Sequence, residues 1–112
     1  MSTYTYEPDH IKENGKDRMR FELGDTMVEG GVETCALCDE EYTAALSIYP
    51  NSWRRAKLAL LESVVRRFSY EVDTKVGPLS LSLRQRAEAW KAMYDDLKAE
   101  CAAMGAPSAN PK

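Results

Sequence analysis

The sequence predicts an all-α fold. We expect a small bundle of about four helices, in which two long antiparallel helices are joined by an extended arm or short hairpin and both terminal segments are flexible. From Lys16 onward, apolar residues recur at spacings of three and four, as they do on one face of a helix. Residues that cap or break helices, such as Gly24, Pro50 and Gly105, follow these periodic segments. With 112 residues, the chain has room for one domain and a single modest core.

The chain divides into three parts. Residues 1–15 mix tyrosines, threonines and a proline without helical periodicity, and they predict an extended N-terminal arm that is loose unless a partner holds it. Residues 16–105 form the helical bundle domain, which carries an arm of its own at residues 71–82. Residues 106–112 contain two prolines and show no periodicity, so they predict a flexible tail.

The first helix is predicted to be short. It starts at about Lys16, carries Met19 and Leu23 on one face, and ends at Gly24, which is a good C-cap residue. The sequence MVEGGVET that follows reads as a loop.

A capping box predicts the second helix. Cys38 takes the cap position, and Glu41 follows three residues later, with Asp39 and Glu40 between them at the positive end of the helix dipole. The helix runs to about Tyr49 and is ended by Pro50. Its buried residues are predicted to be Tyr42, Ala45, Leu46 and Tyr49.

The third helix, from about Ser52 to Tyr70, is predicted to be the central one. Its apolar stripe consists of Trp53, Ala56, Leu60, Val64 and Phe68, widened by Leu61 and Val65. Its other side is basic, and its single acid, Glu62, is spaced to pair with Arg66. We expect this basic side to face solvent, a neighbouring subunit or nucleic acid phosphates. Its cations are Arg54, Arg55, Lys57, Arg66 and Arg67.

The segment EVDTKVGPLSLS at residues 71–82 is longer than the two to eight residues that usually join helices. Its leucines and valine are apolar, while the Gly-Pro pair fixes a bend. The segment predicts a projecting contact element, although its apolar side chains also allow it to fold back over the core. Its candidate partner-binding residues are Val76, Gly77, Pro78, Leu79 and Leu81.

A heptad seam marks the fourth helix. Ser82 and Gln85 form its capping box, and Gly105 is its predicted stop. The seam steps four and three residues in turn through Leu83, Ala87, Trp90, Tyr94, Leu97, Cys101 and Met104.

Charge is unevenly distributed along the chain. Residues 1–50 hold 11 acidic and 4 basic side chains, a net charge of -7, whereas residues 51–112 hold 7 acidic and 11 basic ones, a net charge of +4. This division favours head-to-tail contact between copies, the alternative being that both halves are simply solvated.

The residue types in this chain favour a protein that acts by binding other molecules rather than by catalysis. Cys35 and Cys38 have a spacing that suits zinc binding or disulfide exchange, but the only further ligands would be His10 and Cys101. The better interpretation is that the two cysteines have no shared chemical role. A histidine-based triad would depend on His10 in the loose arm, and no phosphate-binding glycine loop is found. We therefore predict no enzyme activity, no catalytic residue, no metal and no cofactor.

The sequence also bears on location. No apolar run approaches the roughly 18 residues that a membrane span needs. The first residues, MSTYTYEPDH, lack the basic and apolar regions of a signal peptide, and the odd number of cysteines suits a reducing compartment. We expect the protein to remain in the cytoplasm or in an assembly built there.

The order of these elements resembles one known family. Phe21 to Thr26 (FELGDT), Leu37 to Tyr42 (LCDEEY), Val76 to Ser80 (VGPLS) and Gln85 to Ala87 (QRA) occur in the order and spacing of the head-to-tail connector, or adaptor, proteins of tailed bacteriophages and their prophages. The similarity spans roughly Lys16 to Leu97. The cysteine pair and the long N-terminal arm depart from the family pattern.

The resemblance implies a structural virion protein that is not an enzyme. Such proteins form a ring, usually of twelve copies, beneath the portal in the neck between capsid and tail, where they extend the DNA channel and carry the stopper or tail. DNA passes without sequence readout. The resemblance also implies that residues 76–81 and the terminal segments contact neighbours, the portal or the next ring.

Two alternatives are kept open. The first is a small helical regulatory or adaptor protein that binds a partner helix along the seam from Leu83 to Met104. The second is a small zinc protein that uses Cys35 and Cys38.

Overall fold

The computed structural model describes residues 2–74 and 81–109. This part of the chain contains α-helices and short 3₁₀ helices and no strand, which confirms the predicted all-α fold. The α-helices are α1 (Lys16–Leu23), α2 (Asp39–Ile48), α3 (Trp53–Thr74) and α4 (Leu81–Ala109), and the 3₁₀ helices are Pro8–His10 and Val28–Glu33.

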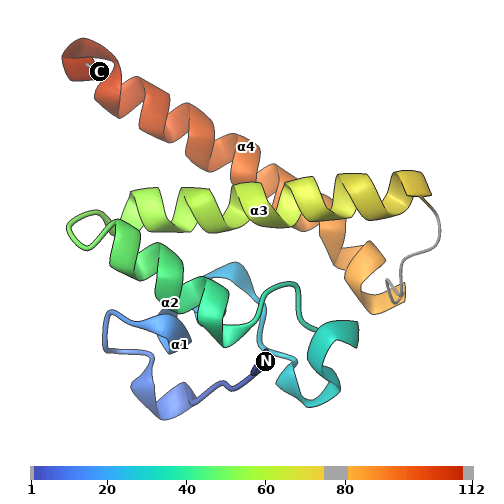
Figure 1. Ribbon diagram of the computed structural model, residues 1–112. Coiled ribbons are helices and arrows are strands. Elements are labelled where there is room, and N and C mark those ends of the chain that lie inside the picture. Colours follow the sequence, from blue (N-terminus) through green and yellow to red (C-terminus); the bar gives the residue numbers. More distant parts are fainter. Residues whose placement is uncertain (1, 75–80, 110–112) are drawn as a thin grey trace.

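The two long helices form the framework of the bundle. In Figure 1, α3 lies across the molecule, α4 crosses it diagonally in the opposite chain direction, and α1 and α2 lie below α3. The contact between α3 and α4 is the most extensive one between helices in the described part of the chain. The C-terminal part of α4 extends past α3, away from α1 and α2 (Figure 1).

The predicted apolar faces meet in one core. Trp90 of α4 is 1% exposed, and its ring stacks on Phe68 of α3 with 5.5 Å between ring centroids. Its indole N–H donates to the Leu23 carbonyl over 2.8 Å, so a polar group in the core is satisfied. The core also holds Met19, Leu23, Ala36, Leu37, Tyr42, Ala45, Ala56, Leu60, Leu61, Val64 and Leu83.

Local sequence signals place the ends of the first two helices correctly. Gly24 caps α1 with φ of +76°, a left-handed conformation that favours glycine. The capping box of α2 is present, and the Cys38 N–H donates to Glu41 Oε1 over 2.9 Å. The segment predicted as a loop after α1 contains the 3₁₀ turns of Val28–Glu33, with Gly31 at φ of +58° between them.

The long helices extend further than predicted. α3 continues past Tyr70 to Thr74, and α4 passes Gly105 to reach Ala109, so Gly105 does not end the helix. A glycine permits a helix end but does not force one, and inside a helix it costs only about 1 kcal/mol. The first four residues of the predicted tail, 106–109, therefore belong to α4, and residues 110–112 lie outside the described residues.

The arm predicted at 71–82 is shorter than expected. Its first four residues continue α3, and Leu81 is the first residue of α4, so that only residues 75–80 connect the two helices. A connection of this length is ordinary for a helical hairpin, which corrects the premise that the segment is too long for one. The candidates Val76, Gly77, Pro78 and Leu79 lie outside the described residues.

Candidate functional site

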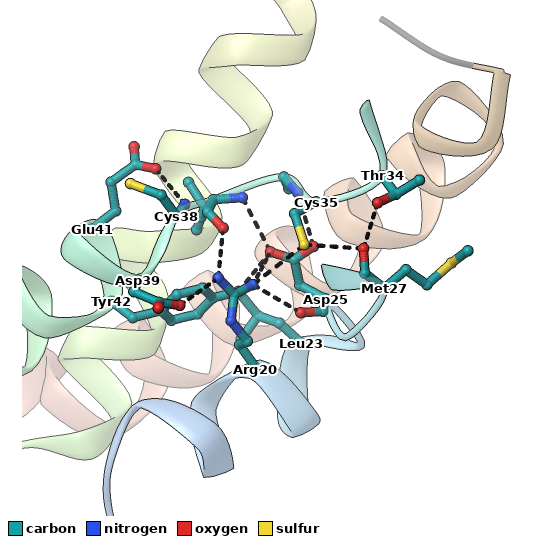
Figure 2. A network of polar contacts seen from close by, with 12 residues as sticks. Arg20, Leu23, Asp25, Met27, Thr34, Cys35, Cys38, Asp39, Glu41 and Tyr42 are labelled. Atoms are coloured by element: carbon teal, nitrogen blue, oxygen red, sulfur yellow. Dashed lines mark hydrogen bonds and ion pairs between the residues drawn. The ribbon is translucent and has the colours of Figure 1, made fainter. Parts of the chain in front are cut away.

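The most polar part of the interior is a network centred on Arg20 of α1 (Figure 2). Arg20 is fully buried, and its guanidinium donates to three carbonyl groups, those of Thr5, Asp25 and Leu37, each over 3.0 Å. It also donates to the carboxylates of Asp25 (3.2 Å) and Asp39 (3.0 Å). The guanidinium carbon lies 4.6 Å from the centre of the Tyr42 ring. Arg20 thus connects the N-terminal arm, α1, the segment before α2 and α2 itself.

Asp25 is the second centre of this network and is also fully buried. It follows the glycine cap of α1, and its carboxylate accepts the N–H groups of Ala36 (2.8 Å) and Leu37 (3.1 Å) and the hydroxyl of Tyr42 (2.9 Å). Burial, followed by the nearby Asp25 charge, raises the pKa of Tyr42 well above its ordinary value. Tyr42 therefore stays neutral and acts as a donor to Asp25.

The two cysteines before α2 have different partners. Cys35 Sγ donates to the Met27 carbonyl over 3.3 Å and lies 3.7 Å from Arg20 Nη1, whereas the Cys38 side chain caps α2. Burial, followed by the Asp25 charge, raises the pKa of Cys35 to about 11, and burial also raises the pKa of Cys38. Both thiols are therefore protonated at neutral pH, and a protonated thiol is a poor nucleophile and a poor metal ligand.

The other two residues considered for a zinc site lie elsewhere. His10 Nδ1 is 3.5 Å from Asp17 Oδ2, and Cys101 is a half-buried residue of α4. Among the residues that the structure describes, no three histidine, cysteine, aspartate or glutamate side chains gather as a possible metal-binding group.

The N-terminal arm is held by the chain itself, which sequence reasoning missed. The backbone N–H and hydroxyl of Thr3 donate to the two carboxylate oxygens of Glu40, over 3.0 and 2.7 Å. The same two groups of Thr5 donate to the carboxylate oxygens of Asp39, over 3.0 and 2.6 Å. Repeated threonines in the arm and adjacent acids at a helix start were the available signals, but nothing in the sequence joins them across more than 30 positions.

These contacts keep both carboxylates ionised. Hydrogen bonds from Thr3 lower the pKa of Glu40 to about 2. Burial opposes ionisation of Asp39, but hydrogen bonds from Thr5 and Arg20 outweigh it and lower its pKa to about 2. The interpretation of Asp39 and Glu40 as helix-capping acids is therefore incomplete, because both also bind the arm.

The five basic residues of α3 do not share one surface. Lys57 turns toward α1, where its ammonium lies 3.4 Å from Glu22, and Arg67 donates to the Ala36 carbonyl. Both are only half-exposed. The predicted basic face is corrected accordingly: three exposed residues remain, Arg54, Arg55 and Arg66. Arg66 forms the predicted pair with Glu62 at 3.3 Å, and Arg54 lies 3.3 Å from Glu100 of α4.

An open groove of about 630 Å³ lies between the start of α3 and the later part of α4. Leu58, Ala59, Cys101 and Ala102 give it an apolar floor, and charged residues such as Arg55 stand among its lining. Arg54 and Arg55 belong to this lining, so two of the three exposed arginines stand at the groove.

The seam of α4 is mostly occupied within the chain. Leu83 and Trp90 are buried, and Ala87, Tyr94 and Leu97 pack against the core as partly buried residues. A partner helix could not reach the first half of this seam unless α4 separated from α3. Cys101, further along, is half-buried and lines the groove.

Comparison with known proteins gives no relative: no family model, no curated protein and no solved structure matches this chain. In the described part of the chain, none of the helices combines the length and the apolar character that crossing a membrane requires.

Proposed function

We propose that this chain is a head-to-tail connector subunit of a tailed bacteriophage or prophage, a structural protein of the virion neck. Copies form a ring, usually of twelve in the family it resembles, that binds the portal, extends the DNA channel and carries the stopper or tail. The ring assembles in the bacterial host cytoplasm. No catalytic step and no cofactor belong to this function.

One observation supports the proposal, because it links two parts of the resemblance physically. The segments FELGDT and LCDEEY, which carry much of the similarity, meet in a single buried contact. Asp25 of the first segment accepts the Leu37 N–H and the Tyr42 hydroxyl of the second, over 3.1 and 2.9 Å. Buried polar groups need such partners, so each of the two segments satisfies buried groups of the other. The resemblance therefore rests on residues that depend on one another physically.

The surface of the molecule is consistent with an assembly role. The groove between α3 and α4 and the exposed Arg54, Arg55 and Arg66 offer places for a neighbouring subunit or for DNA phosphates. Residues 76–79 and Leu81 keep the role of candidate contacts to the portal, a neighbour or the tail. A regulatory protein that binds a partner helix along the whole seam is less well supported, because Leu83 and Trp90 already pack in the core.

Mass measurement tests the proposal. The purified protein is analysed alone and mixed with the portal of the same phage or prophage, and we expect a ring-sized complex on the portal. Persistent failure to join the portal over a range of concentrations would overturn the function. A chain that lacks residues 75–80, closed by a short turn, should keep its helicity but fail to assemble. If that variant assembles normally, the connection between α3 and α4 is not a contact element.

A further inference from the structure

The N-terminal arm is bound in the way that a protein binds an extended peptide. Besides the two donors that it directs at Glu40, Thr3 accepts the Asp39 N–H on its carbonyl over 2.7 Å. Thr5 repeats the pattern two residues later, with two donors on Asp39 and a carbonyl that accepts from Lys16 (2.7 Å) and Arg20 (3.0 Å). Residues two apart face the same side of an extended chain, so both threonines meet the two neighbouring acids.

The residue between the threonines faces elsewhere. Tyr4 is half-buried, and its ring lies 3.7 Å from the place that a Cβ on Gly31 would occupy. The site therefore distinguishes positions along the arm: two hydroxyl residues on one side and an aromatic residue between them. Backbone hydrogen bonds that hold an extended segment, combined with alternate side chains that specify it, are typical of strand-like peptide recognition.

The arm can leave this site without opening the core. None of residues 2–11 is buried, and its contacts are mostly hydrogen bonds at exposed positions. Residues 8–15 tether it to α1. In the structure they include the 3₁₀ helix Pro8–His10. If that turn unwinds, the eight residues span up to about 26–29 Å, a length comparable to the 22 Å of the thinnest dimension of the molecule. This length lets the arm reach a copy that packs next to its own site.

We propose that Asp39 and Glu40 form an interaction site for the N-terminal arm of a second copy, and that copies exchange arms when they associate. The occupant follows from the structure, because the segment seated on the site is present in every copy. An exchanged arm makes the same contacts between copies that it makes within one, so exchange changes little contact energy and is favoured by high local concentration. This inference goes beyond the proposed function. Arm exchange requires only a second copy of the chain, whereas the proposed function also requires the portal and the tail.

Two variants test the exchange. The first lacks residues 2–7 and so has an empty site, and the second keeps its arm but carries Asp39→Asn together with Glu40→Gln. Native mass spectrometry of the mixture should show a one-to-one complex. As the matched control, the second variant also carries Thr3→Val and Thr5→Val, which remove only the two hydroxyls and leave both backbone donors, and its complex should be at least about tenfold weaker. Absence of the complex with the threonines intact overturns the exchange.

A synthetic peptide of residues 2–7 tests the recognition separately. It should bind the arm-deleted chain, and its double-valine form should bind at least about tenfold more weakly, since each lost hydroxyl bond to a charged acceptor is worth roughly that factor. If the arm-deleted chain does not fold alone, recovery of its helical circular dichroism on addition of the peptide is the readout. Equal effects of both peptides, or none from either, overturn the recognition. The portal takes no part in these measurements, so this inference and the proposed function can fail independently.

Discussion

Replacement of Asp25 by asparagine tests the buried contact that joins the two segments of the family resemblance. The amide keeps the shape of the side chain but turns one acceptor into a donor. In one orientation its NH₂ group faces the Ala36 N–H, and in the other it faces the Leu37 N–H and the Tyr42 hydroxyl. In both, Arg20 loses one of its two carboxylate partners.

The expected loss of folding stability follows from the burial of Asp25 and Arg20. Removal of one partner from a buried ion pair costs about 3–5 kcal/mol, out of a total stability of about 5–15 kcal/mol for a domain of this kind. Tyr42→Phe removes a single hydrogen bond to a charged group and leaves Asp25 with its other donors, so it should cost only about 1.5–3 kcal/mol. Asp95→Asn, on the exposed side of α4 beside Lys91, is the surface control and should stay within about 0.5 kcal/mol of the parent protein.

Urea unfolding followed by far-ultraviolet circular dichroism measures all three variants. With an m-value of about 1–3 kcal/mol/M, Asp25→Asn should lower the unfolding midpoint by about 1 M or more. The double variant with Tyr42→Phe should lose less than the sum of the two single losses, because both substitutions weaken the same hydrogen bond between Tyr42 and residue 25. An Asp25→Asn variant as stable as Asp95→Asn, or strict additivity with Tyr42→Phe, would refute the role assigned to Asp25.

Three further predictions use other parts of the molecule. Trp90→Ala removes a core ring and should cost about 3–5 kcal/mol in the same assay; a nearly neutral result would mean that the seam of α4 is open. Acid should detach the arm: Asp39 and Glu40, with pKa values lowered to about 2, stabilise the docked arm fully above their ordinary values of 3.8 and 4.5 and lose that effect as the pH falls toward 2. Amide resonances of Thr3 and Thr5 that stay constant from pH 6 to pH 2 would contradict this. A thiol reagent at pH 8 should modify Cys101 first and reach Cys35 and Cys38 only on unfolding, and equal rates for all three would show that the buried thiols are accessible.

The helices and their buried faces could be predicted from the sequence because the signals are local. The stripe of α3 and the first half of the α4 seam follow from the 3.6-residue period, and each residue on them needs only a generic apolar neighbour. The caps at Gly24 and Cys38 act over a few residues, so they too can be read directly. The continuation of α3 past Tyr70 and of α4 past Gly105 could not, since glycine and polar residues allow a helix to stop without forcing it to do so.

The polar contacts of the interior could not be predicted because they are specific and distant in sequence. An arginine in a short helix usually faces solvent, yet Arg20 is fully buried, since the arm, Asp25 and the segment before α2 supply acceptors for its donors. Lys57 and Arg67 differ from Arg20, because helical spacing alone indicates where they lie. Lys57 is three residues before Leu60 and four before Leu61, and Arg67 is three after Val64, so both fall on the side of the apolar stripe. There they contact Glu22 and the Ala36 carbonyl.

These contacts change how the uneven charge distribution between the two halves of the chain should be interpreted. Among the side chains that the structure describes in residues 1–50, six acids contact groups of the same chain, namely Asp17, Glu22, Asp25, Asp39, Glu40 and Glu41. From the basic half, Lys57 reaches Glu22, and Arg67 and Arg86 reach carbonyl groups of Ala36 and Thr34. The two halves therefore complement each other within one molecule, and less charge is left for a neighbour than the net values of -7 and +4 indicate. In the arm exchange proposed above, the contacts between copies are hydrogen bonds from uncharged threonine groups rather than ion pairs. Such association should therefore weaken only modestly between low and physiological salt.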